Sequence, residues 1–381
     1  MPGGRVAVIG GSITGCAFAL AAVRGGADEV TVYERTTGEL ADRGVGIALQ
    51  VDRYAELVDA GYIDDSTPWR IVTNRKWFLD DGTSPRGRVV WDQPHAFRVY
   101  NWGQLWQGLR RRVPAEVEYR GGTPVTVDDA GRVCLPDGTR EHYDVVIGAD
   151  GYGSAVREAV FPSAVPQFSG YVMWRGSCVW EHEPIDHLIS ICLPNAQGVM
   201  YRIPGSVGDR MSWGLYTAIT GTGDPRPDLL AQTRKYYPPF WADLVTGTPE
   251  RDTLIQPIND LVVDAYTSGR TVLAGDAATI ARPHVASGAV KALQDAVAFE
   301  AACRAAGPGG SWDDVLARYQ AERHPAGAAL VRVARSMGYA MVEHTPDWAA
   351  MTPDLMERWW AAQNPDDGFG GHAIGASISA R

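Results

Sequence analysis

A short apolar strand, a glycine turn and a helix of small residues open the chain, and this feature limits its fold most strongly. Residues 5–9 are apolar and end at Gly10-Gly11, and residues 13–23 are small and apolar on nearly every face. The run EVTVYE at 29–34 predicts a second strand. A strand, tight turn, helix and strand in this order predict parallel pairing with a right-handed crossover.

The turn itself carries a dinucleotide-binding fingerprint. In GGSITG, residues 10–15, Ser12 stands at the second glycine position, so the backbone still approaches a pyrophosphate that faces the helix N-terminus. Glu34 ends the second strand, where an acidic side chain would accept hydrogen bonds from an adenosine ribose. A glycine-rich turn without a ligand is the alternative interpretation of this segment taken alone.

Two later strands also end in an aspartate. Asp150-Gly151 follows the apolar run DVVIGA and precedes Ser154 and Arg157, and Asp276 follows the apolar run TVLAG. In a parallel sheet both strands end at the crevice where nucleotides bind. An isolated Asp-Gly is more often an ordinary turn. Together with the opening turn, however, these two segments predict a site for flavin adenine dinucleotide (FAD).

The loop after Asp276 leads into a helix that starts with small residues. Pro283-His284 is followed by Ala286, Ser287, Gly288 and Ala289. Unpaired N–H groups at this helix start would favour the negative charge that develops at N1 and the C2 oxygen of a reduced flavin.

Alternating apolar residues predict a second, mostly antiparallel sheet. The alternation covers residues 170–260 and returns in shorter runs at 69–100, and Asp137-Gly138 predicts a hairpin before the strand 143–148. We therefore predict an α/β fold with a Rossmann-like FAD-binding domain, an inserted, mostly antiparallel substrate sheet and C-terminal helices. The expected boundaries are 1–70, 101–168 and 263–330 for the FAD-binding parts, 71–100 for substrate-sheet strands, 169–262 for the substrate domain, and 331–381 for a C-terminal helical segment.

The remaining segments have simpler patterns. Residues 44–49 predict a loop, and residues 51–60, 102–113 and 286–303 predict helices. A helical pattern continues from residue 312, and Pro325 is expected to kink or divide it.

Composition limits the partners. A formal net charge of −10 argues against nucleic acid or an anionic membrane surface as the main partner. Five scattered cysteines without a C-x-x-C pair favour reduced thiols in the cytoplasm over disulfides or a metal site. No run approaches the roughly 18 apolar residues that span a bilayer. We expect a cytoplasmic monomer or homodimer.

The whole chain resembles the single-component, FAD-dependent aromatic hydroxylases, the group that includes 4-hydroxybenzoate hydroxylase. It is most similar to the 2,6-dihydroxypyridine 3-hydroxylase type, on GGSITG, YVMWRG at 171–176, GDAA followed by RPHVASG at 282–288, and KALQDA at 291–296. The resemblance implies that NADH or NADPH, visiting transiently, reduces FAD. It also implies that O₂ forms a flavin C4a-hydroperoxide, which hydroxylates a small electron-rich aromatic or N-heteroaromatic substrate.

The resemblance extends to individual residues. It implies that Glu34 lies at the adenosine ribose, Asp150 near the pyrophosphate and the passing nicotinamide, and Asp276 at the ribityl and phosphate region. The full set of expected cofactor contacts is Gly10, Gly11, Ser12, Ile13, Thr14, Gly15, Glu34, Arg35, Arg43, Leu49, Arg98, Val125, Asp150, Gly151, Asp276, Pro283, Ala286, Gly288 and Ala289.

A substrate pocket is expected on the inserted sheet. Its expected members are Trp174, Tyr201, Trp213, Tyr216 and His284. His284 is the expected catalytic residue, a proton acceptor that would turn a phenol into a phenolate, and a structural histidine in a turn is the alternative. Aromatic side chains on a sheet are more often plain core. Arg175 and Arg202 are candidates to pair with a substrate carboxylate, although exposed strand arginines are the commoner case.

Other functions stay open at this point. The same flavin chemistry would serve epoxidation or oxidative cyclisation of an indole- or polyketide-like metabolite. A flavin-binding protein without catalysis, such as a sensor, is the alternative of another class. A plain NAD-dependent dehydrogenase leaves the segments around Asp150 and Asp276 unexplained.

Overall fold

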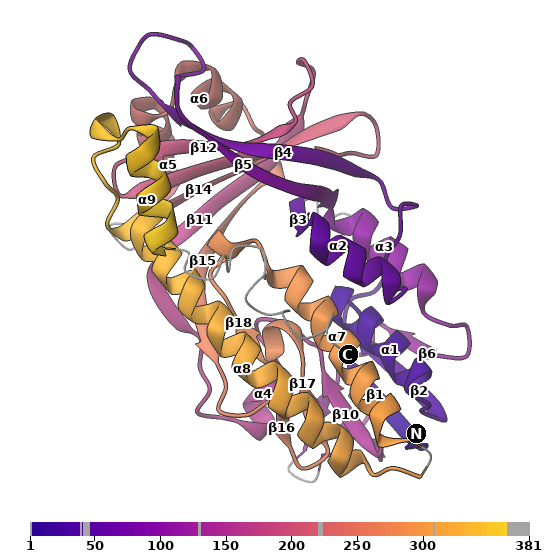
Figure 1. Ribbon diagram of the computed structural model, residues 1–381. Coiled ribbons are helices and arrows are strands. Elements are labelled where there is room, and N and C mark those ends of the chain that lie inside the picture. The colour runs from indigo at the N-terminus through magenta and orange to yellow at the C-terminus, as the bar shows by residue number, and fades with distance from the viewer. Residues whose placement is uncertain are drawn as a thin grey trace.

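The computed structural model describes residues 2–38, 40, 46–128, 131–219, 224–307 and 309–363. Two large sheets dominate it, and Figure 1 shows one above the other with the long helix α8 (Trp312–Gly338) running alongside both. The observed architecture is the predicted α/β fold with a Rossmann-like part and a sheet-rich part. Among the described residues, none of the helices combines the length and apolar character that crossing a bilayer requires.

The first sheet has six strands in the order β16-β17-β10-β1-β2-β6. Its strands are β1 (Arg5–Ile9), β2 (Glu29–Glu34), β6 (Glu118–Gly121), β10 (Val145–Gly148), β16 (Thr267–Ser268) and β17 (Thr271–Leu273). Neighbouring strands pair in parallel, except β16 with β17. The carboxyl ends of β1, β2, β10 and β17 therefore lie along one edge of the sheet.

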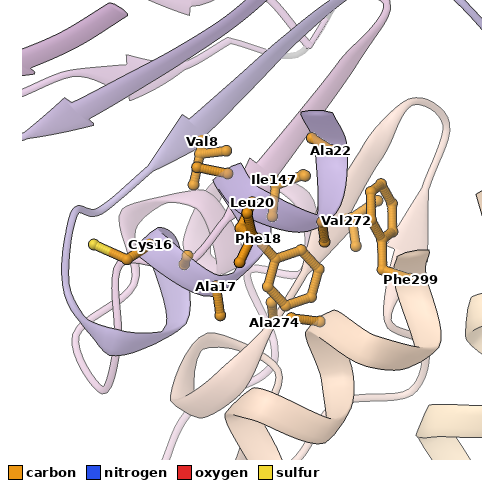
Figure 2. Close-up of a cluster of buried hydrophobic side chains, with 14 of the residues drawn as sticks. Val8, Cys16, Ala17, Phe18, Leu20, Ala22, Ile147, Val272, Ala274 and Phe299 are labelled. Carbon is orange, nitrogen blue, oxygen red and sulfur yellow. The ribbon is translucent and has the colours of Figure 1, made fainter. Parts of the chain in front are cut away.

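Two helices cover one face of this sheet. Helix α1 (Ile13–Arg24) packs against helix α7 (Gly288–Ala306), and the rings of Phe18 and Phe299 lie 5.4 Å apart between centroids. Figure 2 shows both rings beside Val8, Ile147 and Val272 of the strands. Because α1 is enclosed by the sheet, α7 and a third helix, it needs apolar side chains on nearly every face, as its sequence has.

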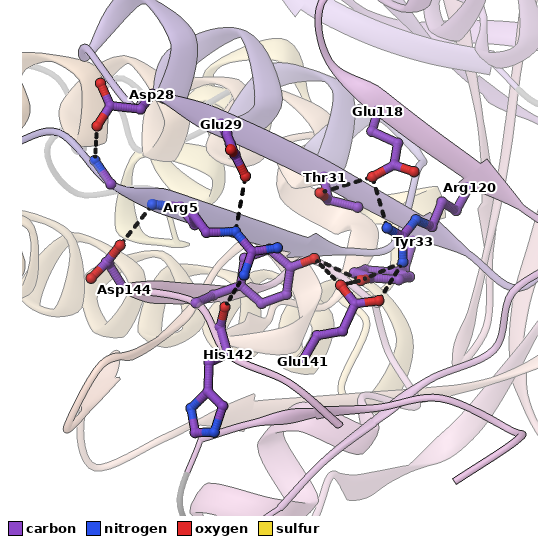
Figure 3. Close-up of polar contacts among 12 residues, drawn as sticks. Arg5, Asp28, Glu29, Thr31, Tyr33, Glu118, Arg120, Glu141, His142 and Asp144 are labelled. Carbon is purple, nitrogen blue, oxygen red and sulfur yellow. Dashed lines mark hydrogen bonds and ion pairs between the residues drawn. The ribbon is translucent and has the colours of Figure 1, made fainter. Parts of the chain in front are cut away.

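Polar side chains link β1, β2 and β6 to the segment that precedes β10, as Figure 3 shows. Arg5 donates to Glu29 at 2.9 Å and to the carbonyl of His142 at 2.8 Å. The hydroxyl of Tyr33 donates to Glu141, which also pairs with Arg120 at 2.6 Å. These contacts link β1 and β2 to the segment that precedes β10.

The second sheet has nine strands in the order β18-β15-β11-β14-β13-β12-β4-β5-β3. Its strands are β3 (Gly46–Gln50), β4 (Trp69–Leu79), β5 (Arg88–Asn101), β11 (Gln167–Val179), β12 (His187–Leu193), β13 (Ala196–Pro204), β14 (Asp209–Ala218), β15 (Thr253–Val262) and β18 (Thr279–Ile280). All neighbours pair antiparallel except β4 and β12, which pair in parallel. One parallel contact thus joins two distant parts of the chain into one sheet.

The other elements are smaller or cover these sheets. The helices are α2 (Val51–Asp59), α3 (Trp102–Arg112), α4 (Ala155–Val160), α5 (Arg226–Tyr236), α6 (Pro239–Thr246) and α9 (Pro353–Gln363), with short helical turns at Glu250–Asp252, Gly275–Ala277, Pro283–Val285, Tyr339–Glu343 and Trp348–Ala350. A small sheet consists of β7 (Thr126–Val127), β8 (Val133–Cys134) and β9 (Arg140–Glu141). The predicted hairpin at Asp137-Gly138 is confirmed between β8 and β9.

One local prediction was wrong, and one of the two outcomes expected at Pro325 is excluded. Residues 46–49, predicted as part of a loop, belong to strand β3 because they find a partner in β5. Pro325 does not divide the C-terminal helix, since α8 runs through it. The proline removes one backbone hydrogen bond, but α8 packs against α7 before it and against β15 after it, which holds the helix together.

Candidate functional site

A cavity of about 930 Å³ is lined by residues from both large sheets. The six-stranded sheet contributes the carboxyl ends of β1, β2 and β10, and the nine-stranded sheet contributes β3, β11, β13, β14 and β15. The loop at 281–287 and the start of α7 complete the wall. The three segments singled out in the sequence therefore meet at one cavity.

The glycine turn at residues 10–15 places backbone that no large side chain covers next to this cavity. Gly10 has φ +104°, and a Cβ there would lie 2.4 Å from the carbonyl oxygen of Ala149. A Cβ on Gly15 would lie 1.7 Å from the carbonyl oxygen of Gly10, so α1 starts in direct contact with the turn. Ser12 precedes α1 without capping it through its side chain. The first N–H groups of α1 are thus left for a ligand, which fits a pyrophosphate.

Glu34 is held at the end of β2 by two backbone donors. Its Oε2 accepts from the N–H of Gly11 at 2.7 Å, and its Oε1 accepts from the N–H of Thr36 at 2.8 Å. The side chain is only 6% exposed, yet it lines the cavity beside Arg35. A carboxylate has about four acceptor positions, so about two remain for hydrogen-bond donors of a ligand.

Asp150 lines the cavity and also caps a helix. Its carboxylate accepts from the Ser154 hydroxyl and, at 3.1 Å, from the N–H of Val156 at the start of α4. Burial raises the pKa of Asp150, and these hydrogen bonds oppose the shift. Asp150 and Gly151 therefore form an ordinary turn that supports α4 and also line the cavity.

The turn that carries Asp276 rests on a buried ionic network. Lys291 donates to the carbonyl of Gly275 at 2.7 Å and pairs with Asp295 at 3.2 Å. Asp295 also accepts from the N–H of Gly275 at 3.1 Å and pairs with Arg323 at 2.8 Å. These contacts fix the backbone of Gly275, and the next residue, Asp276, is exposed and lines the cavity. Surrounding protein atoms displace water from the Asp276 carboxylate and so raise its pKa, and the positive charge of Lys291 opposes that shift.

The start of α7 also leaves backbone groups facing the cavity. Ala286 is left-handed, with φ +50°, and Ser287 does not cap α7 through its side chain. A Cβ on Gly288 would meet nothing within 4 Å, so open space lies next to the first turn of the helix. Pro283, Ala286, Gly288 and Ala289 all line the cavity. Since α7 begins at Gly288, the predicted helix start at residue 286 is two residues early, but the small residues lie at the cavity as expected.

The register of β11 decides which of its side chains face the cavity. Met173 and Arg175 line it, whereas Trp174 points to the opposite face of the sheet, because side chains alternate along a strand. There Trp174 packs against Trp213, with ring centroids 4.9 Å apart. The structure thus places Trp174 outside the cavity that it was expected to line.

Two other expected pocket aromatics lie at the cavity. Tyr201 and Tyr216 line it from β13 and β14. Trp213 reaches the lining only at its position on β14, because its ring lies with Trp174 on the opposite face of the sheet, where its nitrogen donates at 3.0 Å to Thr248 just after α6. The expectation of a pocket role therefore fails for the Trp213 ring as it does for Trp174.

His284 lines the cavity with both ring nitrogens bonded to protein. Its Nδ1 lies 3.0 Å from Oε1 of Gln197, and its Nε2 lies 2.8 Å from the hydroxyl of Tyr171. Since the Gln197 oxygen can only accept, Nδ1 carries the proton and Nε2 accepts from Tyr171. Burial lowers the pKa of His284 to about 3. The ring of Tyr216 lies 4.5 Å from the imidazole, so the histidine is also packed in place.

Acid is expected to destabilise the protein through His284. Its pKa of about 3 lies below the ordinary value of 6.5, so between these values the unfolded chain binds a proton that the folded chain does not. Stability is then full above pH 6.5 and falls by about 1.4 kcal/mol per pH unit below it. Urea unfolding at pH 4 to 7 should show that the free energy of unfolding falls less steeply with decreasing pH in His284→Gln than in the wild type. Replacing the exposed His182 controls for losing a histidine, and equal slopes for His284→Gln and wild type would contradict the expectation.

Several expected contacts lie elsewhere. Leu49 is fully buried in the core. Arg98 pairs with Asp65 and stacks 3.6 Å from the ring centroid of Tyr54, outside the cavity lining. Arg202 pairs with Asp209 and does not line the cavity either. Val125 and Arg35 do line it, and Arg43 lies outside the described residues.

Arg75 and Gln197 are among the lining residues that sequence reasoning missed. Arg75 reaches the cavity from β4, and Gln197 reaches it from the start of β13. Neither belongs to a local motif. Only the pairing of β4 with β12 and the register of β13 bring them to the site.

Comparison with known proteins is consistent with this geometry. Residues 137–334 match the family model described as FAD binding domain. The chain is 28% identical to 2,6-dihydroxypyridine 3-monooxygenase of Paenarthrobacter nicotinovorans, over 77% of this chain and 81% of that protein. It is also 28% identical to 3-amino-4-hydroxybenzoate 2-monooxygenase of Streptomyces cremeus, over 95% of this chain and 93% of that protein.

Solved structures share the fold. The 2,6-dihydroxypyridine-3-hydroxylase from Arthrobacter nicotinovorans superposes with a TM-score of 0.75 at 24% identity, covering 90% of this chain and 94% of that one. Klebsiella pneumoniae HpxO, solved with FAD and uric acid, gives a TM-score of 0.75 at 22% identity, covering 94% of this chain and 92% of that one.

Proposed function

The chain belongs to the FAD-binding domain family that its residues 137–334 match, and from this we propose that it is an FAD-dependent monooxygenase. It uses NADH or NADPH and O₂ to hydroxylate a small electron-rich aromatic or N-heteroaromatic compound. Relatives named for hydroxypyridine and aminohydroxybenzoate substrates support this class. The observation that carries the proposal is one cavity with backbone-rich dinucleotide turns at one end and aromatic strand residues at the other.

The residues of the cavity wall indicate which part of FAD each segment would bind. We propose that the opening turn holds the pyrophosphate, Glu34 the adenosine ribose, and the Asp276 turn the ribityl chain. When bound, FAD supplies electron transfer from the nicotinamide and the activation of O₂. We propose that the uncapped N–H groups at the start of α7 would hold the isoalloxazine end of the cofactor, next to the open space at Gly288.

The substrate end excludes water and fixes orientation. Tyr216 and His284 present ring surfaces to the cavity, and Met173 adds an apolar contact. These ring and thioether surfaces would limit the access of water to a flavin bound beside them. The loop that carries His284 is braced by Arg282, which pairs with Asp260 at 2.9 Å and with Glu343 at 2.6 Å.

The catalytic role of His284 stays a prediction. Both of its ring nitrogens have protein partners, and its lowered pKa keeps it neutral at physiological pH. It would accept a substrate proton only after Tyr171 leaves Nε2. A positioning role, in which it orients Tyr171 and Gln197, is the alternative.

Product analysis tests the proposed function. Purified protein should be yellow, and one member of a panel of phenols, hydroxypyridines and aminophenols should stimulate NADH or NADPH oxidation. With ¹⁸O₂, the hydroxylated product should carry one labelled oxygen. An unlabelled product would contradict oxygen insertion, and folded, colourless protein that does not take up FAD would contradict flavin binding itself. A labelled epoxide or ring-closed product would instead favour epoxidation or cyclisation of a larger metabolite.

The cellular setting is also a proposal. All five cysteines are free thiols in the structure, which suits a reducing compartment such as the cytoplasm. We propose a monomer or a homodimer, and light scattering during gel filtration distinguishes the two.

A further inference from the structure

The part of the cavity wall formed by the nine-stranded sheet carries positive charge. Arg75 and Arg175 line it from β4 and β11. Among the described lining residues, the carboxylates are Glu34, Asp150 and Asp276, and all three lie at or just after the carboxyl ends of strands of the six-stranded sheet. The two ends of the cavity therefore differ in charge, and the substrate end is cationic.

Arg175 is the better-placed of the two cations to bind a ligand. Its Nε is buried and has no hydrogen-bond partner, and among the described residues no carboxylate is one of the groups that act on its guanidinium. Burial lowers its pKa, while Tyr216 and Tyr201 oppose the shift. Arg175 is half-buried, and a cation partly removed from water without a counter-charge is costly, so the site is suited to a ligand that brings a negative charge.

Arg75 is held in a defined orientation. Its guanidinium carbon lies 4.0 Å from the ring centroid of Trp77 and 5.0 Å from that of Trp360, which comes from helix α9. Its Nε donates to the hydroxyl of Ser190 at 2.7 Å. Stacking between aromatic rings fixes a planar guanidinium while leaving its charge intact. Helix α9 therefore helps to position a cation at the cavity wall.

Tyr216 lies within the field of both arginines. Each of the two lowers the pKa of its hydroxyl, against a larger rise caused by burial. The ring of Tyr216 in turn packs against His284. A substrate ring that lies along Tyr216 and His284 would thus place its substituents near one or both guanidinium groups.

We propose that the substrate binds as an anion, with a negatively charged oxygen held by Arg175 and faced by Arg75. This inference rests on the proposed function, because it names the substrate class of the same site. Two sources share this chemistry: a carboxylate on the ring, and a ring hydroxyl that has lost its proton. Arg202, the other arginine considered from the sequence, is paired with Asp209 away from the cavity and has no part in this site.

Binding of matched probes to the FAD-loaded enzyme tests the proposal. The probes are 4-hydroxybenzoate, its neutral analogue 4-hydroxybenzamide, and 4-nitrophenol titrated across its own ionisation, and the signal is the change in flavin absorbance. The wild type should bind at least one anionic probe more tightly than the amide. Preference for 4-hydroxybenzoate identifies a carboxylate, and nitrophenol binding that follows phenolate formation identifies an ionised hydroxyl.

Variants separate a ligand contact from a structural cation. Arg175→Met should weaken binding of the preferred anion by about 10- to 100-fold and change the amide affinity less than about threefold. Arg175→Lys should recover part of the loss, since it restores the charge without the planar fork. Arg202→Met is the matched control, because Asp209 keeps Arg70 as a partner, and it should bind every probe as the wild type does.

Equal loss of anion and amide binding in Arg175→Met would overturn the proposal, as would a wild-type enzyme that binds none of the anions or prefers the amide. The readout is independent of turnover. If anions bind through Arg175 but no compound is hydroxylated, the proposed function fails while the anion site stands. If only neutral compounds are hydroxylated, the anion site fails while the monooxygenase stands.

Discussion

Gly15→Ala is expected to yield a protein that no longer retains FAD. The added Cβ would lie 1.7 Å from the carbonyl oxygen of Gly10, and a backbone atom cannot rotate away as a side chain can. Helix α1 would have to move off the turn that begins the cavity. Overpacking typically costs about 1 to 3 kcal/mol, and a clash with backbone belongs at the upper end of that range; the displaced N–H groups would also no longer meet the pyrophosphate. The flavin-to-protein ratio after gel filtration and the thermal unfolding midpoint measure both effects.

Gly121→Ala provides the matched control for this variant. Gly121 ends β6, and a Cβ there would meet only the carbonyl oxygen of Thr36, at an ordinary 3.8 Å. That variant should keep its flavin and its unfolding midpoint. Yellow Gly15→Ala protein with wild-type stability would show that the turn tolerates a side chain, and the assignment of this turn to the pyrophosphate would lose its basis.

Asp295→Asn is expected to lower the free energy of unfolding by about 3 to 5 kcal/mol. The carboxylate lies between Lys291 and Arg323, and all three side chains are about 1% exposed. Removing the one negative charge leaves two buried cations without compensation. Urea unfolding with FAD in excess measures the loss, and flavin retention should fall too, because Asp295 also accepts from the N–H of Gly275.

Asp313→Asn is the control for the loss of a carboxylate. Asp313 pairs with Arg270 at the surface, where both side chains are largely exposed, and such pairs contribute little to stability. Equal unfolding curves for Asp295→Asn and Asp313→Asn would mean that the buried network does not stabilise the fold.

The nucleotide-binding half could be predicted from sequence because its signals are local. Residues 5–9 and 29–34 form β1 and β2 with the predicted bounds, since each is a short run rich in β-branched residues that is closed by a turn. The aspartates at 150 and 276 lie at the cavity because parallel strands end along a common edge. Local pattern and global topology agree in this half.

The substrate half depends on pairings that local patterns do not contain. A shift of one residue moves a strand side chain to the other face, and this is why Trp174 lies opposite to its expected side while Arg175 lines the cavity. Residues 46–49 form a strand only because β5 lies next to them. Arg75 reaches the site only through the pairing of β4 with β12.

That parallel pairing has a consequence for biosynthesis. Strands β4 and β5 leave the ribosome early, but the neighbour that covers the open side of β4 is β12, which ends at Leu193. During the synthesis of the intervening residues a nascent chain exposes an unsatisfied strand edge, the kind of surface that recruits other chains into aggregates. Ribosome stalling before Leu193 should therefore yield insoluble or chaperone-bound fragments, while stalling well after that point should release chains able to complete the sheet.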